Sequence, residues 1–311
     1  MLVKVKSLKQ RTRITDYCEI HFPILGSRSA VKKAIAKGLV FLNNRRAKDT
    51  DLLNNGDVIK LKRPGKQKVK KIDLATPIPI IYEDEYIIVA NKPAGIAVNG
   101  NRNKTLENAV ASIFQASEQA DALLQPVAAH RIDVPTKGLV ILAKTKKALI
   151  NLNKAFQNHQ IKKAYIAIVH GQTPEKGRIE VPIQGKDAIT EYERLAVVPS
   201  KIFQHLSLLR LSLITGRTHQ LRIHLSTQSH LIVGDKEYAK GRRTILGKGL
   251  FLCSCELAFT HPCLGTPVHL KIDPPVRFKR LMEREGGRFS KTRSTSNSTS
   301  TSKPNFKSRR Y

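Results

Sequence analysis

The chain has 311 residues, and its 55 lysines and arginines outnumber its 24 aspartates and glutamates, for a formal net charge of +31. A solvated surface needs no such excess of one sign, so the composition indicates a polyanionic partner, most often nucleic acid. An anionic membrane would call for a basic amphipathic helix or a lipidation signal, and the sequence has neither. No apolar run reaches the ~18 residues of a membrane span, and lysines interrupt the first residues where a signal peptide would be apolar, so we expect a cytoplasmic protein.

Residues 1–62 predict a compact domain of their own. Ser27 or Ser29 can cap a helix that ends at Gly38, because a serine side chain accepts from the first free amides and glycine tolerates the left-handed conformation after a helix. Short strands follow around two turns, at Asn43-Asn44 and at Asn55-Gly56-Asp57, which have the residues that tight turns need.

The polar side of this helix is basic, and its sequence resembles a known RNA-binding module. The pattern S-R-S-x-x-K-K-x-I-x-x-G-x-V-x-x-N, followed by N-G-D-V-I, is similar to that of the S-four-type RNA-binding domain, named for a small-subunit ribosomal protein. The resemblance implies a small α/β domain in which Arg28, Lys32 and Lys33 contact the RNA backbone. The alternative is a helix face that is merely solvated, and the charge of the whole chain favours RNA binding over it.

Next comes a basic run over 63–71 that is nearly devoid of apolar residues and predicts a linker over 63–76. A larger domain is expected over 77–287. It begins with a buried strand at 86–90, a turn at Asn91-Lys92-Pro93-Ala94-Gly95 and a helix at 106–114.

After a central loop, the chain alternates between strands and a few helices. The expected helices cover 145–158, 218–228 and 277–284, and the expected strands cover 164–169, 178–183, 189–196, 204–213 and 250–259. This hairpin-like succession predicts an α+β domain built on a mixed, largely antiparallel sheet. The last segment, 288–311, is Ser, Thr, Lys, Arg and Asn with almost no apolar residue, so we expect a disordered tail.

The cysteines suit neither a disulfide framework nor a standard metal site. There are four, at Cys18, Cys253, Cys255 and Cys263, in a long chain. Cys253 and Cys255 alternate onto one face of a strand, with Cys263 and His261 nearby in sequence, but the spacing matches no zinc template. Small buried thiols are the better interpretation, and we predict no bound metal.

The central loop His130–Gly138 has charge, proline and glycine and runs directly into the apolar segment Leu139–Ala143. Such a loop on a buried strand holds a reactive side chain, here Asp133, in a fixed place while leaving it open to a ligand. The kinase signatures are absent, the glycines from Gly241 to Gly249 do not have phosphate-loop spacing, and there is no G-x-G-x-x-G. No cofactor, and in particular no nucleotide cofactor, is therefore expected.

Three polar motifs remain, and they occur in a fixed order. They are H-R-I-D-V-P-T-K-G-L-V-I-L-A-K from His130, K-A-Y-I-A-I-V-H-G from Lys163 and T-G-R-T-H-Q-L-R-I-H from Thr215. Together with N-K-P-A-G from Asn91 and F-T-H-P from Phe259, they closely resemble the motifs of the RluA-type family of pseudouridine synthases. The resemblance spans nearly all of 77–285 and implies an isomerase that turns uridine in RNA into pseudouridine.

The resemblance also implies roles for individual residues. Asp133 matches the catalytic carboxylate, Tyr165 the tyrosine that stacks on the target base, and Arg222 the arginine that keeps the carboxylate ionised in an enclosed pocket. Arg131 matches the residue that fills the space left when the uridine is flipped out of its stack, or that grips its backbone. Any one of these residues on its own could have a purely structural role. Their joint occurrence in matching motifs is what indicates catalysis.

Two positions depart from the family pattern. Lys137 stands where serine is usual and Asn99 where histidine is common, which puts substrate choice in doubt more than activity. Ribosomal RNA of the large subunit is the favoured substrate, because an S-four-type domain usually accompanies the enzymes that modify it, and transfer RNA stays open. The alternative from another class is a non-catalytic RNA-binding or ribosome-assembly protein that keeps the fold. A monomer is expected.

Overall fold

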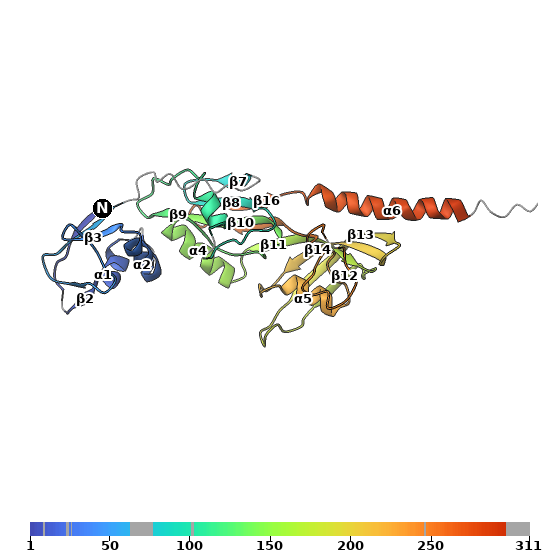
Figure 1. Cartoon of the computed structure of the whole chain (residues 1–311), viewed down its shortest axis with the longest axis horizontal. Helices are drawn as coiled ribbons and strands as arrows, with labels where there is room; N and C mark the ends of the chain where they lie inside the picture. The colour runs from blue at the N-terminus through green and yellow to red at the C-terminus, as the bar shows by residue number, and fades with distance from the viewer. Residues whose placement is uncertain are drawn as a thin grey trace, which may run out of the picture. The chain divides into compact units, whose positions relative to one another are not determined.

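The computed structural model describes residues 1–8, 10–22, 25, 27–62, 77–100, 103–245 and 247–296 (Figure 1). The predicted linker and the end of the predicted tail, 297–311, lie outside the described residues. The chain divides into two compact units, one made of Met1–Lys162 and Glu256–Ile272 and the other of Lys163–Cys255 and the chain from Asp273. The limits of these units differ from those of the predicted domains, 1–62 and 77–287. The domain limits therefore remain predictions.

The first unit begins with a small α/β fold that has its own apolar core. Its helices are α1 (Ile14–His21) and α2 (Arg28–Ala36), its four-stranded sheet has the order β1 (Leu2–Lys4), β6 (Val58–Leu61), β3 (Val40–Leu42) and β4 (Arg45–Arg46), and β2 (Thr12–Arg13) pairs with β5 (Leu52–Leu53). Ser27 caps α2 by accepting from the amide of Ala30, as predicted. Asn43 and Asn44 both have positive φ, which a tight hairpin turn requires. Ile14, Val31 and Ile59 are fully buried in the core.

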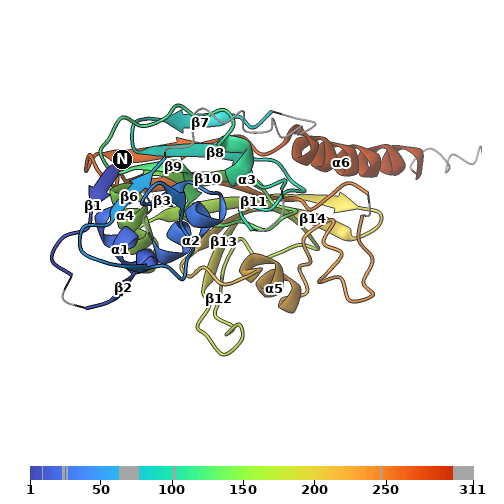
Figure 2. The same cartoon turned by 60° about the vertical axis from the view of Figure 1, so that its left-hand side comes forward.

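The rest of this unit is a sheet with two helices. In order, its strands are the later residues of β15 (Leu252–Thr260), then β10 (Lys137–Thr145), β8 (Ile87–Lys92) and β7 (Ile80–Glu83), with β16 (Pro267–Lys271) paired to β15 and β9 (Ala122–Ala128) paired to β10. Strands β8 and β10 are antiparallel and lie side by side (Figure 2). Leu139–Ala143 are fully buried, as the apolar run predicts.

Helices α3 (Leu106–Val110) and α4 (Lys146–Gln157) start at the threonine caps Thr105 and Thr145. Helix α3 ends before the predicted 114. The hydroxyl of Ser112 donates to the carbonyl of Ala109, and the chain leaves the helix in tight turns. A serine that competes for a helical carbonyl in this way favours an early end.

The second unit is built on antiparallel strand pairs. Its strand order is β12 (Lys176–Ile179), β13 (Thr190–Ser200), β14 (Gln204–Leu213) and β11 (Lys162–His170), followed by the first residues of β15. Its helices are α5 (Gln220–Thr227) and α6 (Val276–Ser296). Strands β12, β13, β14 and β11 pair antiparallel, and with few helices beside them this confirms the predicted α+β class.

Two helices of this unit differ from their predicted limits. Helix α5 begins at Gln220 and not at Thr218, because His219 before it has a φ of 56° and cannot continue a right-handed helix. Helix α6 continues past the predicted end at Arg284 to Ser296, into the first part of the segment expected to be disordered. The extension contains no proline, so the helix continues through Gly286 and Gly287, although glycine is an unfavourable helix residue. No described helix is both long and apolar enough to cross a membrane.

Candidate active site and RNA-contact surface

The loop that carries Asp133 is fixed by an internal turn and by the strand that follows it. The amide of Thr136 donates to the main-chain carbonyl of Asp133 at 3.0 Å, and Ile132 is buried beside it. After the loop, Gly138 pairs with Lys92 where β10 begins. The side chain of Asp133 is half-buried and that of Arg131 is exposed. The loop therefore holds a carboxylate at a defined position within reach of solvent, as the sequence predicts.

Lys92 ties this loop to the N-K-P-A-G turn. Its side chain is fully buried, and Nζ donates to the carbonyls of Pro93 at 2.9 Å, Ile96 at 2.9 Å and Val134 at 3.2 Å. Burial lowers the pKa of Lys92 to about 8, and the negative charge of Asp133 acts in the opposite direction. Lys92 is thus a buried cation whose charge acts on Asp133, and it braces the residue that follows Asp133 in the chain.

No role for Lys92 follows from the sequence, although Lys92 lies in the N-K-P-A-G motif. The available signal was its position at the end of the apolar strand Ile87–Lys92, where a lysine must either leave the sheet or find buried acceptors. The sequence alone does not show which of the two occurs.

In the second unit, Tyr165 lies in β11 and is 6% exposed, opposite Leu211 of β14. Lys163 stands two positions earlier, on the same face of the strand. Burial lowers the pKa of Lys163. A Cβ atom at Gly216 would lie 3.6 Å from Nζ of Lys163, so the turn of the third motif passes close to this amine. An aromatic ring and a desolvated amine thus share one face of β11.

Arg222 of α5 is held by two carboxylates. Its Nε donates to Asp235 Oδ2 at 2.7 Å, and its Nη2 donates to Asp235 Oδ1 at 2.8 Å and to Glu237 Oε2 at 2.9 Å. The ring centroid of Tyr238 lies 4.8 Å from its guanidinium carbon. Burial alone would lower the pKa of Arg222, but the two carboxylates raise it. The sequence predicted Asp133 as the partner of Arg222; Asp133 belongs to the first unit and Arg222 to the second, so that pairing remains a prediction.

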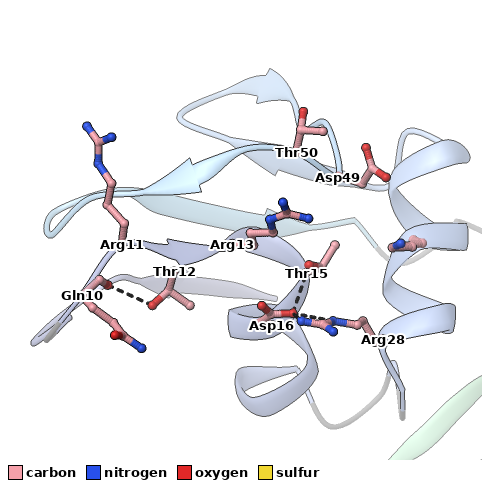
Figure 3. A pocket seen from close by; sticks show the side chains of 10 residues that line it. Gln10, Arg11, Thr12, Arg13, Thr15, Asp16, Arg28, Asp49 and Thr50 are labelled. Atoms are coloured by element: carbon pink, nitrogen blue, oxygen red, sulfur yellow. Dashed lines mark hydrogen bonds and ion pairs between the residues drawn. The ribbon is translucent and has the colours of Figure 1, made fainter.

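The small N-terminal fold carries a basic hollow of about 430 Å³ (Figure 3). It is lined by Gln10, Arg11, Thr12, Arg13, Thr15, Asp16, Arg28, Lys32, Asp49 and Thr50. Of the predicted RNA-binding residues, Arg28 and Lys32 line it and Lys33 does not. Arg28 points to Asp16 and pairs with it. Two arginines that the sequence analysis did not select, Arg11 and Arg13, add to its positive charge.

Lys33 lies elsewhere in the first unit, near Glu107 of α3. Burial raises the pKa of Glu107, whereas the bond from the amide of Ala128 and the charge of Lys33 oppose that rise. Asn99, one of the two departures from the family pattern, also hydrogen-bonds to Glu107. Lys33 thus has an acidic neighbour within the protein.

The cysteines are free in the structure. Cys18, Cys253 and Cys255 are buried and Cys263 is half-buried. A hydrogen bond with Cys253, together with burial, raises the pKa of the Cys255 thiol far above its usual range, so it does not ionise readily. His261 donates to Asp84 at 2.8 Å and accepts from two main-chain amides, which gives it a structural role.

Comparison with known proteins identifies the family. The family described as RNA pseudouridylate synthase matches residues 86–227. An uncharacterized RNA pseudouridine synthase of Aquifex aeolicus is 31% identical, over 82% of this chain and 88% of the relative's length. The chain belongs to the RluA-type family of RNA pseudouridine synthases.

Other members of the family agree with this placement. Ribosomal large subunit pseudouridine synthase D of Zymomonas mobilis is 32% identical, over 72% of this chain and 78% of the relative's length. The dual-specificity RNA pseudouridine synthase RluA of Yersinia pestis is also 32% identical, over 62% of this chain and 98% of the relative's length. The structure of human RNA pseudouridylate synthase domain containing 4 aligns with a TM-score of 0.52 at 24% identity, covering 66% of this chain and 92% of that chain, which supports the fold. The enzyme is therefore an RNA pseudouridine synthase, an isomerase, as the motifs predict.

Proposed function

We propose that this RNA pseudouridine synthase modifies specific uridines of large-subunit ribosomal RNA and that Asp133 is its nucleophile. The observation that carries the assignment of Asp133 is the loop itself: Asp133 is half-buried, a turn closes between Asp133 and Thr136, and the buried cation Lys92 acts on the charge of Asp133. A carboxylate held in this way keeps its negative charge and its direction of attack.

The reaction needs little more than such a carboxylate. The bond between C1′ of the ribose and N1 of uracil breaks, the ring turns, and C5 bonds to C1′ in its place. The C5 proton leaves and N1 takes up a proton, so the product is an isomer of the substrate and no electrons are gained or lost. A single nucleophile or base can therefore serve both halves of the reaction without a cofactor.

Three further residues complete the proposed site. Tyr165 stacks on the uracil ring, which remains bound while it turns, and its flat apolar face suits a flipped base. Arg222 supplies the guanidinium that favours the ionised form of the nucleophile. Arg131, exposed next to Asp133, fills the space that the flipped uridine leaves or grips its backbone. These roles rest on the motif matches, and the burial of Tyr165 and Arg222 is compatible with them.

Two relatives, from Zymomonas mobilis and Buchnera aphidicola, are named as large-subunit ribosomal synthases, which supports ribosomal RNA as the substrate. Transfer RNA is the competing substrate, and the relative from Yersinia pestis is named a dual-specificity RNA pseudouridine synthase. Mapping of pseudouridine in total RNA from cells with and without this gene distinguishes them. We expect the pseudouridine that depends on this gene to lie in large-subunit ribosomal RNA. A difference confined to transfer RNA would replace the proposed substrate, and no difference in any RNA would contradict both substrates.

The basic hollow should contribute to the salt dependence of RNA binding. Each phosphate contact releases counterions, so losing one should reduce the slope of log K against log salt by about 1. We therefore expect Arg13→Gln and Lys32→Gln each to weaken RNA binding and to make its salt dependence shallower. Lys60→Gln, which also removes an exposed lysine of this fold but does not line the hollow, is the matched control. Equal slopes for all variants would place the phosphate contacts elsewhere.

A further inference from the structure

We infer that Asp235 is a positioning residue for this reaction, which fixes the guanidinium of Arg222 in one orientation. The inference depends on the proposed role of Arg222, since Asp235 acts only through that side chain. It assigns a task to a residue that follows the third motif in the chain and that the reaction itself does not use.

The pair between Arg222 and Asp235 is both buried and bidentate. Arg222 is 4% exposed and Asp235 is 1% exposed, and their two hydrogen bonds measure 2.7 and 2.8 Å. Two parallel bonds to one planar group determine its position and its plane, which a single contact cannot do. Glu237, by contrast, makes one bond of 2.9 Å from a side chain that is 57% exposed. The buried carboxylate is therefore the one that sets the orientation.

The turn that carries Asp235 leaves this carboxylate little freedom. Gly234 has a φ of 82°, and a Cβ atom there would lie 2.0 Å from the carbonyl oxygen of Gly249, so the two backbones are in close contact. The amide of Gly234 donates to the hydroxyl of Thr244 at 2.9 Å. Oδ1 of Asp235 also accepts from the amides of Glu237 at 3.1 Å and Tyr238 at 3.2 Å. A carboxylate held by its own backbone turn is a rigid support.

Stability alone does not explain such a pair. Burying two charges costs about as much as their attraction returns, and well-packed apolar residues often do equally well. The pair also works against the charge that Arg222 would offer to a nucleophile, because two carboxylates already offset its single positive charge. What it does provide is a guanidinium whose Nε and one terminal nitrogen are committed, so that its direction is defined. Transition-state interactions depend on such a direction.

The test measures single-turnover conversion of uridine in RNA by the full-length enzyme. Asp235→Asn keeps the shape of the side chain but turns an amide donor toward the guanidinium, which has only donors. We expect the rate to fall by about 100-fold, the scale of a misplacement of 1 Å, with RNA affinity unchanged within about two-fold. The rate of the Arg222→Lys variant should fall by at least as much, because lysine cannot make two parallel hydrogen bonds to one carboxylate. Because both variants lose the same oriented group, the double variant should be no slower than Arg222→Lys alone.

Two controls separate positioning from folding. Glu285 is another buried carboxylate of the second unit and accepts from the hydroxyl of Ser200 at 2.8 Å. Glu285→Gln should lower the melting temperature and leave the rate unchanged for the folded enzyme. Glu237→Gln removes the exposed partner and should slow the reaction less than Asp235→Asn does.

Each outcome has a separate meaning. If Arg222→Lys loses activity but Asp235→Asn does not, the positioning role is wrong while the proposed function stands. Additive losses in the double variant would also overturn it, since independent residues add their effects. If Arg222→Lys retains full activity, the proposed role of Arg222 fails, and the inference about Asp235 fails with it.

Discussion

The Asp133→Asn variant is expected to bind RNA like the unchanged enzyme and to release no tritium from RNA labelled at C5 of uridine. An amide of the same shape cannot act as a nucleophile or a base, so both halves of the isomerisation stop. The fold should tolerate the change, because the bond that Thr136 donates ends on the main-chain oxygen of Asp133, which the variant keeps. We expect a loss of more than about 10⁴-fold in rate, the order seen when a nucleophile is removed.

A matched control exists in the same unit. Asp121 accepts from the amide of Lys147 at 2.7 Å at the start of α4, a structural role for the same type of side chain. Asp121→Asn should keep its activity. Tritium release by Asp133→Asn above the rate without enzyme would remove Asp133 from its proposed role, and loss of RNA binding in that variant would show that the carboxylate also supports the binding site.

The sequence predicted the fold wherever the determinants are local. The cap Ser27, the starts of the helices near Leu106 and Lys146 and the buried run Leu139–Ala143 were all predicted, because each depends on neighbours within a few residues. The start of α5 was not predicted, since its left-handed N-cap His219 bonds through Nδ1 to the hydroxyl of Tyr238, far along the chain. Local signals cannot report a bond of that kind.

The contrast between local and long-range determinants also holds for the candidate site. The motifs selected Asp133, Tyr165 and Arg222 by their pattern, but they could not reveal what surrounds them. Burial of Lys92 against main-chain carbonyls, and of Asp235 against Arg222, depends on contacts between segments distant in sequence. Arg11 and Arg13 were likewise missed, because each stands in a short segment without helical periodicity and joins the hollow only when β2 pairs with β5.

Lys92→Met tests whether this buried cation supports both the fold and the reaction. Methionine keeps an apolar stem of similar length but leaves the carbonyls of Pro93, Ile96 and Val134 without this donor. Each unpaired buried group costs about 1–3 kcal/mol, and removal of a buried charge returns part of that, so we expect a net loss of about 2–4 kcal/mol in the free energy of unfolding. Release of the loop should also slow the reaction by about 100-fold.

The matched control for this variant is Lys144→Met. Lys144 is a second buried lysine of the first unit, and it bonds to Glu83 at 3.1 Å. The Lys144→Met variant should also be less stable than the unchanged enzyme. Its reaction rate, measured under conditions where the variant is folded, should stay near that of the unchanged enzyme. Equal rates for Lys92→Met and the unchanged enzyme would show that Lys92 serves the fold alone.

The pH dependence of stability tests the charge of Lys92 separately. Its pKa is about 8 in the folded chain against an ordinary value of 10.5. Below pH 8 both states carry the proton, and the cost of burying the charge is present in full. Between about pH 8 and 10.5 the unfolded chain binds more protons than the folded one, so this lysine makes the free energy of unfolding rise with pH, by at most about 3 kcal/mol. Urea unfolding across this range should therefore show the gap between the unchanged enzyme and Lys92→Met widening as the pH increases. A constant gap would mean that the lysine keeps its proton in the folded chain, and that its charge remains beside Asp133 throughout.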